Sequence, residues 1–258
     1  MYLIAEGELP VCLCAHMDTV FLRPPTTFYF DQEQNVLWSP GGMGADDRAG
    51  IAAIIELIER GYRPHIILTD LEERGGIGAS NLIEKYPECP FSDCRAFIQL
   101  DRQGEKDAVY YECDNPDFEK LITSFGFETE WGTFTDISVF CPQWGIAGVN
   151  LSVGYYNEHS QIEILNITQL YSTIDKVEVM LKECGNWCTY SYVPLVYTRL
   201  PFDSDSMCGK CICCGNIHEE DKLLAYSVSG KAKDAFLVCE NCFKDYFEDT
   251  FEEGPQED

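Results

Sequence analysis

Two adjacent aspartates, Asp46 and Asp47, are the residues of this sequence best suited to acid–base or metal chemistry. They follow a glycine-rich turn and precede a mostly apolar run over residues 51–58. The apolar run predicts a buried helix, so the acidic pair at its start is held against the protein. Two interpretations are open: the carboxylates cap the helix through backbone N–H groups, or they bind a cation.

A histidine follows the first predicted strand. Residues 10–15 predict a short buried strand that ends at His16, and Asp18 comes two residues later. An aspartate in this place can accept a hydrogen bond from the imidazole and turn the other ring nitrogen toward a metal. A solvated surface histidine is the alternative interpretation of this pair.

Three more predicted strands, over residues 65–70, 96–101 and 147–152, are each followed by residues that could bind a metal. Helices are predicted over residues 79–85, 116–125 and 168–183, so strands and helices alternate. This alternation predicts an α/β fold with a mixed, mostly parallel sheet flanked by helices, whose ligand crevice lies at the carboxyl ends of the strands. The side chains expected there are Glu72, Glu73, Asp101 and His159.

The collected side chains match the needs of a pair of divalent metal ions. Two imidazoles and three carboxylates can ligate two such ions when one carboxylate bridges them, with positions left for water. The mixture of nitrogen and oxygen donors favours Zn²⁺, with Co²⁺ or Mn²⁺ as alternatives.

The order of these motifs resembles a known superfamily. His-x-Asp, Gly-Ala-Asp-Asp, Glu-Glu, Asp and a distal His, over residues 10–183, are similar to the co-catalytic dizinc metallopeptidases. That superfamily includes bacterial leucyl aminopeptidase, peptidase T and the tetrahedral aminopeptidases. The resemblance implies a zinc-exopeptidase-like catalytic domain over residues 1–188.

The resemblance also implies a role for each motif. Asp46 would bridge two metals, Asp18 would orient a histidine ligand, and Glu72 would be the general base for a water held between the metals. The implied catalytic metal ligands are His16, Asp46, Glu73, Asp101 and His159.

The implied activity is that of a metal-dependent exopeptidase, a hydrolase. In this superfamily an aspartate at the position of Asp101 goes with aminopeptidases, which favours hydrolysis of N-terminal residues. A dizinc deacylase or carboxypeptidase acting on N-acyl amino acids is one alternative. A non-catalytic metal-binding scaffold for protein interaction is another.

The end of the chain predicts a separate module. Of the 14 cysteines, six lie in the last fifth of the sequence. Residues 189–206 predict a linker, and residues 207–258 predict a zinc-ribbon module with an acidic tail. The expected ligands of one structural Zn²⁺ are Cys211, Cys214, Cys239 and Cys242. Alternative ligands are Cys208, paired with Cys211, and His218. The alternative to a zinc site is a redox disulfide.

The net charge of −26, from 44 acidic against 18 basic residues, argues against binding to nucleic acid or to anionic membranes. The sequence shows no targeting segment and no apolar run of transmembrane length, so we expect a cytoplasmic protein. A peptide substrate is the expected partner. A homo-oligomer or a protein partner could form through the ribbon or through an exposed sheet edge.

Overall fold

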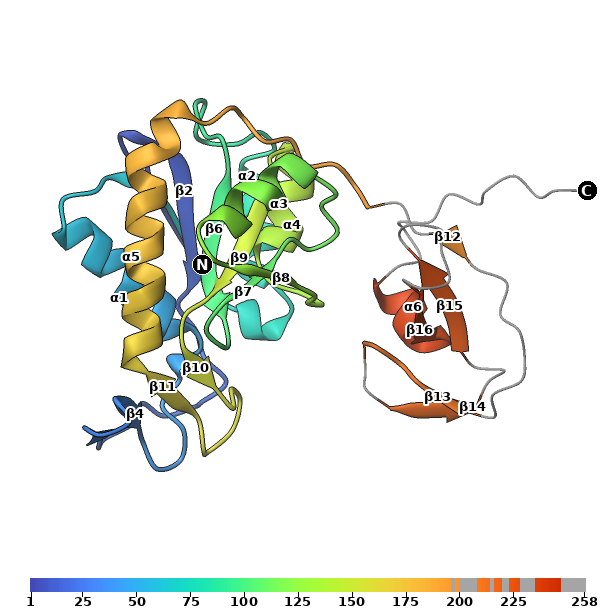
Figure 1. The fold of residues 1–258 in the computed structure, drawn as a ribbon, viewed down its shortest axis with the longest axis horizontal. Coiled ribbons are helices and arrows are strands. Elements are labelled where there is room, and N and C mark those ends of the chain that lie inside the picture. The colour runs from blue at the N-terminus through green and yellow to red at the C-terminus, as the bar shows by residue number, and fades with distance from the viewer. Residues whose placement is uncertain (196–197, 200–207, 214–215, 220–222, 228–234, 247–258) are drawn as a thin grey trace, which may run out of the picture. The chain divides into compact units, whose positions relative to one another are not determined.

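A computed structural model describes residues 1–195, 198–199, 208–213, 216–219, 223–227 and 235–246. The chain divides into two compact units, Met1–Val193 and Pro194–Asp258 (Figure 1). Within the described residues, no helix combines the length and the apolar character needed to cross a bilayer.

A seven-stranded sheet forms the centre of the first unit. Its middle strands β5, β2, β6 and β9 are parallel, whereas β1 and β7 each run antiparallel to their neighbour in this group. The predicted mixed, mostly parallel sheet is therefore confirmed. In spatial order the strands are β1 (Tyr2–Ala5), β5 (Pro64–Thr69), β2 (Leu9–His16), β6 (Phe97–Arg102), β9 (Gly148–Ser152), β7 (Asp107–Val109) and β8 (Glu128–Glu130).

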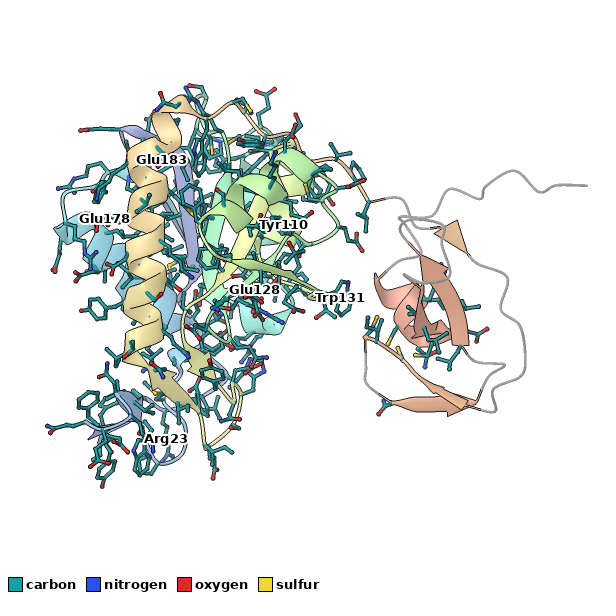
Figure 2. All side chains as sticks on the ribbon, viewed as in Figure 1. Arg23, Tyr110, Glu128, Trp131, Glu178 and Glu183 are labelled. Carbon is teal, nitrogen blue, oxygen red and sulfur yellow. The ribbon has the colours of Figure 1, made fainter. Side chains whose placement is uncertain are left out.

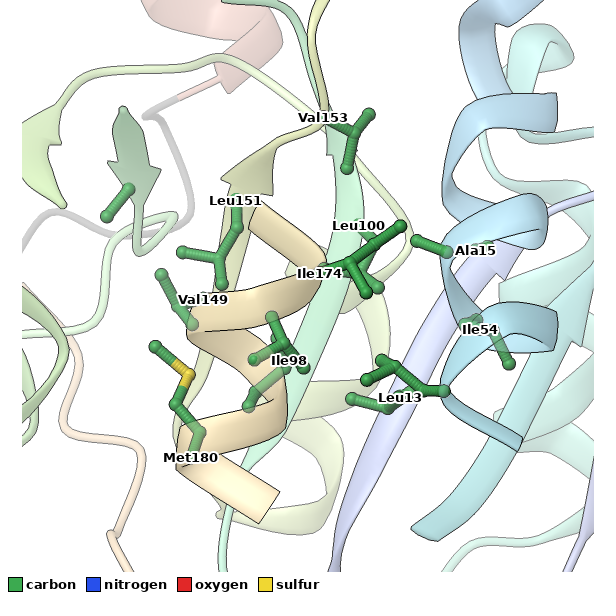
Figure 3. Packing of buried hydrophobic residues seen from close by; sticks show 14 of the residues in the cluster. Leu13, Ala15, Ile54, Ile98, Leu100, Val149, Leu151, Val153, Ile174 and Met180 are labelled. Carbon is green, nitrogen blue, oxygen red and sulfur yellow. The ribbon is translucent and has the colours of Figure 1, made fainter. Parts of the chain in front are cut away.

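Helices cover both faces of this sheet (Figure 1). Alternate side chains of β2 point to opposite faces, as the pleat of a strand requires. Leu13 and Ala15 pack in one core with α1 (Ala45–Glu59), α5 (Ile167–Glu183) and α3 (Pro116–Ser124), as Figure 3 shows in part. Cys12 and Cys14 pack in the other core with α2 (Ile77–Lys85) and α4 (Ile137–Trp144). The two cores hold the sheet from both sides, so its strand ends are fixed.

Ion pairs tie the outer helices together. Arg60, at the end of α1, donates to Glu178 of α5 at 2.6 Å, and the Tyr62 hydroxyl donates to the same carboxylate at 3.0 Å. Figure 2 shows Glu178 and Glu183 projecting from α5. These contacts fix α5 against the helix that begins at the acidic pair.

A smaller antiparallel sheet joins two distant segments of the first unit. Its order is β10-β11-β4-β3, and β4 pairs with β11 so that Leu37 lies opposite Leu165. The pairing places the segment before α1 beside the loop that carries His159. The strands are β3 (Tyr29–Asp31), β4 (Val36–Trp38), β10 (Tyr155–Tyr156) and β11 (Ile164–Asn166).

Strand β1 and helix α4 are among the elements that the sequence did not predict. Strand β1 is an edge strand with alternating partial exposure, which is a weak pattern over four residues. Helix α4 contains Pro142, which normally argues against a helix interior. Its buried side chains Ile137, Phe140 and Cys141 pack on the sheet, so tertiary contact outweighs the local signal.

The second unit is built of short strands and one helix. Leu223, Val238 and three cysteines form its small described core. Its elements are the sheet β12 (Thr198–Arg199), β15 (Leu223–Ser227) and β16 (Ala235–Cys239), the hairpin β13 (Cys208–Lys210) and β14 (Ile217–Glu219), and the helix α6 (Glu240–Tyr246).

Candidate metal centre

Asp46 lies at the centre of the candidate site. Its Oδ1 is 3.0 Å from Nε2 of His16, and its Oδ2 is 3.1 Å from Nε2 of His159. Nε2 of His16 also lies 3.5 Å from Oδ1 of Asp101, and Nε2 of His159 lies 2.9 Å from Oε2 of Glu73. The structure thus brings all five expected ligands together, in two sets that share the carboxylate of Asp46.

The fold positions these side chains from neighbouring strand ends. His16 ends β2, and Asp101 lies near the end of β6, which pairs in parallel with β2. Glu73 belongs to the short helix η1 (Glu72–Arg74), which follows β5 on the other side of β2. His159 lies in the loop between β10 and β11, which the smaller sheet holds beside the start of α1.

The neighbouring carboxylate, Asp47, is engaged in a different way. Its Oδ1 accepts the backbone N–H of Gly50 at 3.0 Å, and its Oδ2 accepts that of His16 at 3.1 Å. Asp47 therefore caps α1 and ties the helix to β2. Possible metal-ligand atoms of His16, Asp47 and Asp101 also lie within 4.8 Å of one another, which is close enough to bind one metal ion. Because both Asp47 oxygens are already paired with backbone donors, the geometry favours Asp46 as the bridging group.

Asp18 makes two kinds of contact. Its Oδ1 lies 3.3 Å from Nδ1 of His16, as the His-x-Asp motif leads us to expect. Its two oxygens also accept the backbone N–H groups of Glu72 at 3.1 Å and Glu73 at 3.3 Å. Asp18 thus connects the end of β2 to η1, a contact between residues more than fifty positions apart that spacing could not indicate.

Glu163 is a buried residue that sequence reasoning missed. Its carboxylate accepts three backbone N–H groups, those of Met43, Gly44 and Asp46. Only 1% of this side chain is exposed. Glu163 therefore fixes the turn that presents Asp46. Its place four residues after His159 is the only signal in the sequence, and that signal does not reveal the contact.

Asp101 is held by its own set of donors. Its Oδ2 accepts the Thr135 hydroxyl at 2.9 Å and the Gln99 amide at 3.1 Å. Asn150 brackets its backbone, accepting the N–H and donating to the carbonyl, both at 2.9 Å. Asp136, which follows Thr135 in the chain, accepts the Thr69 hydroxyl. Oδ1 of Asp101 faces His16 and accepts the Tyr155 hydroxyl at 3.4 Å.

The proximity of so many acids shifts their pKa values. Burial, followed by the nearby Asp101, raises the pKa of Glu72 to about 9. Burial alone would raise the pKa of Asp46, but hydrogen bonds with His159 and His16 lower it to about 2. Hydrogen bonds with Asp46 and Glu73 raise the pKa of His159 to about 10. The protein alone therefore holds extra protons among these groups.

The site's residues fit a pair of divalent cations. Oε1 of Glu73 is buried with no hydrogen-bond partner among the described residues. In the part of the chain that the structure describes, no lysine or arginine forms an ion pair with the site's carboxylates. A buried cluster of acids needs compensating cations, and carboxylate oxygens with imidazole nitrogens suit zinc and related metals.

A second group of possible ligands lies in the other unit. The sulfurs of Cys211, Cys239 and Cys242 are buried and lie within 4.8 Å of one another. The backbone N–H of Cys239 donates to Sγ of Cys211 at 3.3 Å. The fourth expected ligand, Cys214, and the side chains of Cys208 and His218 lie outside the described residues.

Comparison with known proteins finds a matching family model and solved structures with a similar fold. Residues 4–129 match the family model described as Peptidase family M28. The aminopeptidase PepT of Bacillus cereus is 17% identical with a TM-score of 0.55, over 71% of this chain and 84% of that one. A tripeptidase of Staphylococcus aureus is 16% identical with a TM-score of 0.58, over 72% and 84% of the two chains. None of the curated protein sequences matches this chain.

Proposed function

We propose that this chain is a member of peptidase family M28, whose model matches residues 4–129, and that its first unit is a two-metal aminopeptidase. The observation that carries the proposal is the position of Asp46, whose two oxygens face two different histidines. A carboxylate shared in this way is what a pair of divalent ions requires of the protein.

The proposal assigns each ligand to one of two metals. His16, Asp46 and Asp101 would hold one ion, and Asp46, Glu73 and His159 would hold the other. Zn²⁺ is the expected metal, with Co²⁺ or Mn²⁺ as substitutes. Bound metals would supply Lewis-acid polarisation of the scissile carbonyl and would lower the pKa of the attacking water.

Glu72 is the proposed proton carrier. Its Oε2 lies 4.0 Å from Nε2 of His16, next to the ligand sets but outside their shortest contacts. Asp18 fixes the backbone of Glu72, which sets the position of the carboxylate. Glu72 would accept a proton from the attacking water and then donate it to the leaving amine. Burial and Asp101 raise its pKa to about 9 without metals, and two bound cations would lower that pKa so that Glu72 could accept a proton near neutral pH.

The charge of the site favours substrates with a free amino terminus. An ammonium group is attracted to a cluster of carboxylates, whereas the C-terminal carboxylate of a carboxypeptidase substrate is repelled by it. The clustered carboxylates number more than the positive charges of two divalent ions. They are Asp18, Asp46, Asp47, Glu72, Glu73, Asp101 and Asp136.

A structural zinc is proposed for the second unit. Three buried cysteine sulfurs lie close enough to bind one ion, and the N–H of Cys239 would stabilise the Cys211 thiolate. Cys214 would complete the set. A unit of this size has little apolar core, so the metal would contribute to its folding free energy. The excess of acids over bases in the chain disfavours nucleic acid as a partner of this unit. We therefore propose that the second unit contacts protein, including another copy of this chain.

The proposed function is tested with the variant Glu72→Gln. We expect this variant to retain its metals and its unfolding temperature and to lose turnover of aminoacyl amides by roughly 10²- to 10⁴-fold. The same preparation is tested against N-acyl amino acids and peptides with blocked amino termini. Hydrolysis of these blocked substrates alone would replace the aminopeptidase by a deacylase or carboxypeptidase. Metal only in the second unit would refute the two-metal proposal.

A further inference from the structure

Strand β3 and its neighbours present a group of exposed aromatic side chains. Phe28, Tyr29, Phe30 and Trp38 are each between 39% and 51% exposed. They come from β3, the residue before it and the end of β4, and the rings of Tyr29 and Trp38 stack with centroids 4.7 Å apart. Single exposed apolar side chains are common on protein surfaces, whereas a contiguous group marks an interaction surface. We call these four residues the aromatic edge.

The aromatic edge lies at the open side of the smaller sheet. β3 is the last strand in the order β10-β11-β4-β3, so one side of its backbone has no strand beside it in the part of the chain that the structure describes. Trp38 lies opposite both Tyr29 of β3 and Ile164 of β11. Ile162, two residues before Ile164, is also exposed. These strands lie at the end of the first unit where α5 begins (Figure 1).

The two edges of the seven-stranded sheet are protected against pairing with another chain, and β3 is not. Charged side chains and covering segments are the usual protections. β8 carries Glu128 and Glu130, so a second β8 beside it would bring like charges together. β1 is covered in part, because Tyr2 contacts the ring of Tyr86 with centroids 6.3 Å apart. Asp31, the charged residue of β3, is turned toward the β3–β4 turn, where its Oδ1 accepts two backbone N–H groups.

We propose that the aromatic edge binds a second copy of this chain, with the two β3 strands side by side and antiparallel about a two-fold axis at Phe30. In this register Phe30 lies opposite Phe30 of the second copy, and Tyr29 lies opposite Asp31 of the second copy. The Tyr29 hydroxyl can then donate to the Asp31 carboxylate. The two four-stranded sheets become one sheet, and their aromatic side chains meet across the axis.

Charge and area both favour a copy of the same chain as the occupant. At a net charge of −26, two copies repel one another over most of their surface and can approach where acids are few. The four residues of the aromatic edge carry no charge, whereas a basic protein would be attracted to the acidic surfaces instead. The exposed parts of these four rings and of Ile162 offer about 500 Å² per copy. A stable dimer buries about 800 Å² per partner, so the β3 backbone and its surroundings need to supply only the smaller share.

Sedimentation velocity of the full chain over a concentration series tests this proposal. We expect a reversible dimer of the wild-type chain. In Phe30→Glu and in Phe30→Lys, we expect the dissociation constant to rise by at least roughly 100-fold, because each substitution removes a ring and places like charges at the axis in both copies. An equimolar mixture of the two variants should restore the dimer, since opposite charges then meet at the axis.

Leu3→Glu is the matched control. Leu3 is 48% exposed on β1, at an edge of the other sheet, so the same charge enters at an equally exposed apolar position. We expect this variant to dimerise like the wild-type chain. Dimerisation lost in Leu3→Glu and kept in Phe30→Glu would move the interface to β1 and overturn the proposal. A dimer kept in both variants would also overturn it, because association would then run through the second unit or another surface.

Three further outcomes would contradict the proposal. The first is a wild-type chain that stays monomeric at every concentration reached. The second is a mixture of Phe30→Glu and Phe30→Lys that stays monomeric, which would refute the two-fold register. The third concerns Phe28→Glu, which serves if circular dichroism shows a folding defect in the variants at position 30. Phe28 is exposed and precedes β3, so we expect a folded protein whose dimer is roughly tenfold weaker, and unchanged dimerisation would refute the interface.

Discussion

At the scale of single residues, Asp46 and Asp47 show how adjacent identical side chains acquire different tasks. The backbone at both positions departs from helical angles, so their carboxylates point in different directions. Asp47 pairs with the N–H groups of Gly50 and His16, and Asp46 faces the imidazoles of His16 and His159. Capping and metal binding, which are alternatives for the pair as a whole, thus each apply to one member.

This division predicts different outcomes for two matched variants. Asp46→Asn should lose both catalytic metals, because its amide cannot serve as a charged oxygen donor to two ions. Asp47→Asn should keep them and lose roughly 1 to 3 kcal/mol of unfolding free energy, because its NH₂ group would face one of the two backbone N–H groups that the carboxylate accepts. Metal content after dialysis and thermal unfolding measure the two effects. Metal loss in Asp47→Asn alone would identify Asp47 as the bridging carboxylate.

At the scale of elements, the turn before α1 depends on a strand far away in the chain. Glu163, just before β11, accepts the N–H groups of Met43, Gly44 and Asp46, and β11 pairs with β4. One buried carboxylate therefore positions Asp46, and the same short segment carries His159. Hydrogen bonds therefore connect the segment that carries Asp46 to the segment that carries His159.

This link predicts the effect of Glu163→Gln. The amide offers one acceptor oxygen where the carboxylate has two, and its NH₂ group faces backbone donors. We expect roughly 10- to 100-fold weaker metal binding, as is typical when a group that supports a ligand is changed. Glu183→Gln, an exposed change on α5 (Figure 2), controls for the loss of one charge. Equal metal affinity in both variants, measured by competition with a chelator, would contradict the prediction.

At the scale of the whole molecule, the packed acids make the stability of the metal-free first unit depend on pH. The pKa of Glu72 is raised to about 9 by burial and by Asp101, and that of His159 to about 10 by Asp46 and Glu73. In each case the folded state holds a proton that the unfolded chain has already released. The stabilisation is complete below the unfolded pKa and is lost as the pH rises through the folded pKa.

We therefore expect the unfolding temperature of the metal-free first unit to fall between about pH 5 and about pH 9. Added Zn²⁺ should raise the unfolding temperature most at the upper end of this range, because metal binding replaces the protons. Calorimetry with and without metal measures both effects. An unfolding temperature of the metal-free protein that rises over this range would contradict the assignment of the buried acids.

Some strands and helices of the first unit could be predicted from the sequence, and others could not. The strands β2 and β6, which carry His16 and Asp101, were predictable because long apolar runs mark buried parallel strands. Strand β1 and helix α4 were not, since their patterns are short or broken by Pro142, and packing on the sheet decides both. The edge strands of the seven-stranded sheet are β1 on one side and β8 on the other.

The sequence by itself determined the chemical types in the site and their order along the chain, because parallel strands bring their carboxyl ends to one edge of a sheet. The tertiary structure alone decided which oxygen meets which imidazole. It also revealed the support from Glu163 and the second contact of Asp18. These contacts depend on side-chain directions and on long-range pairing, which residue spacing does not encode.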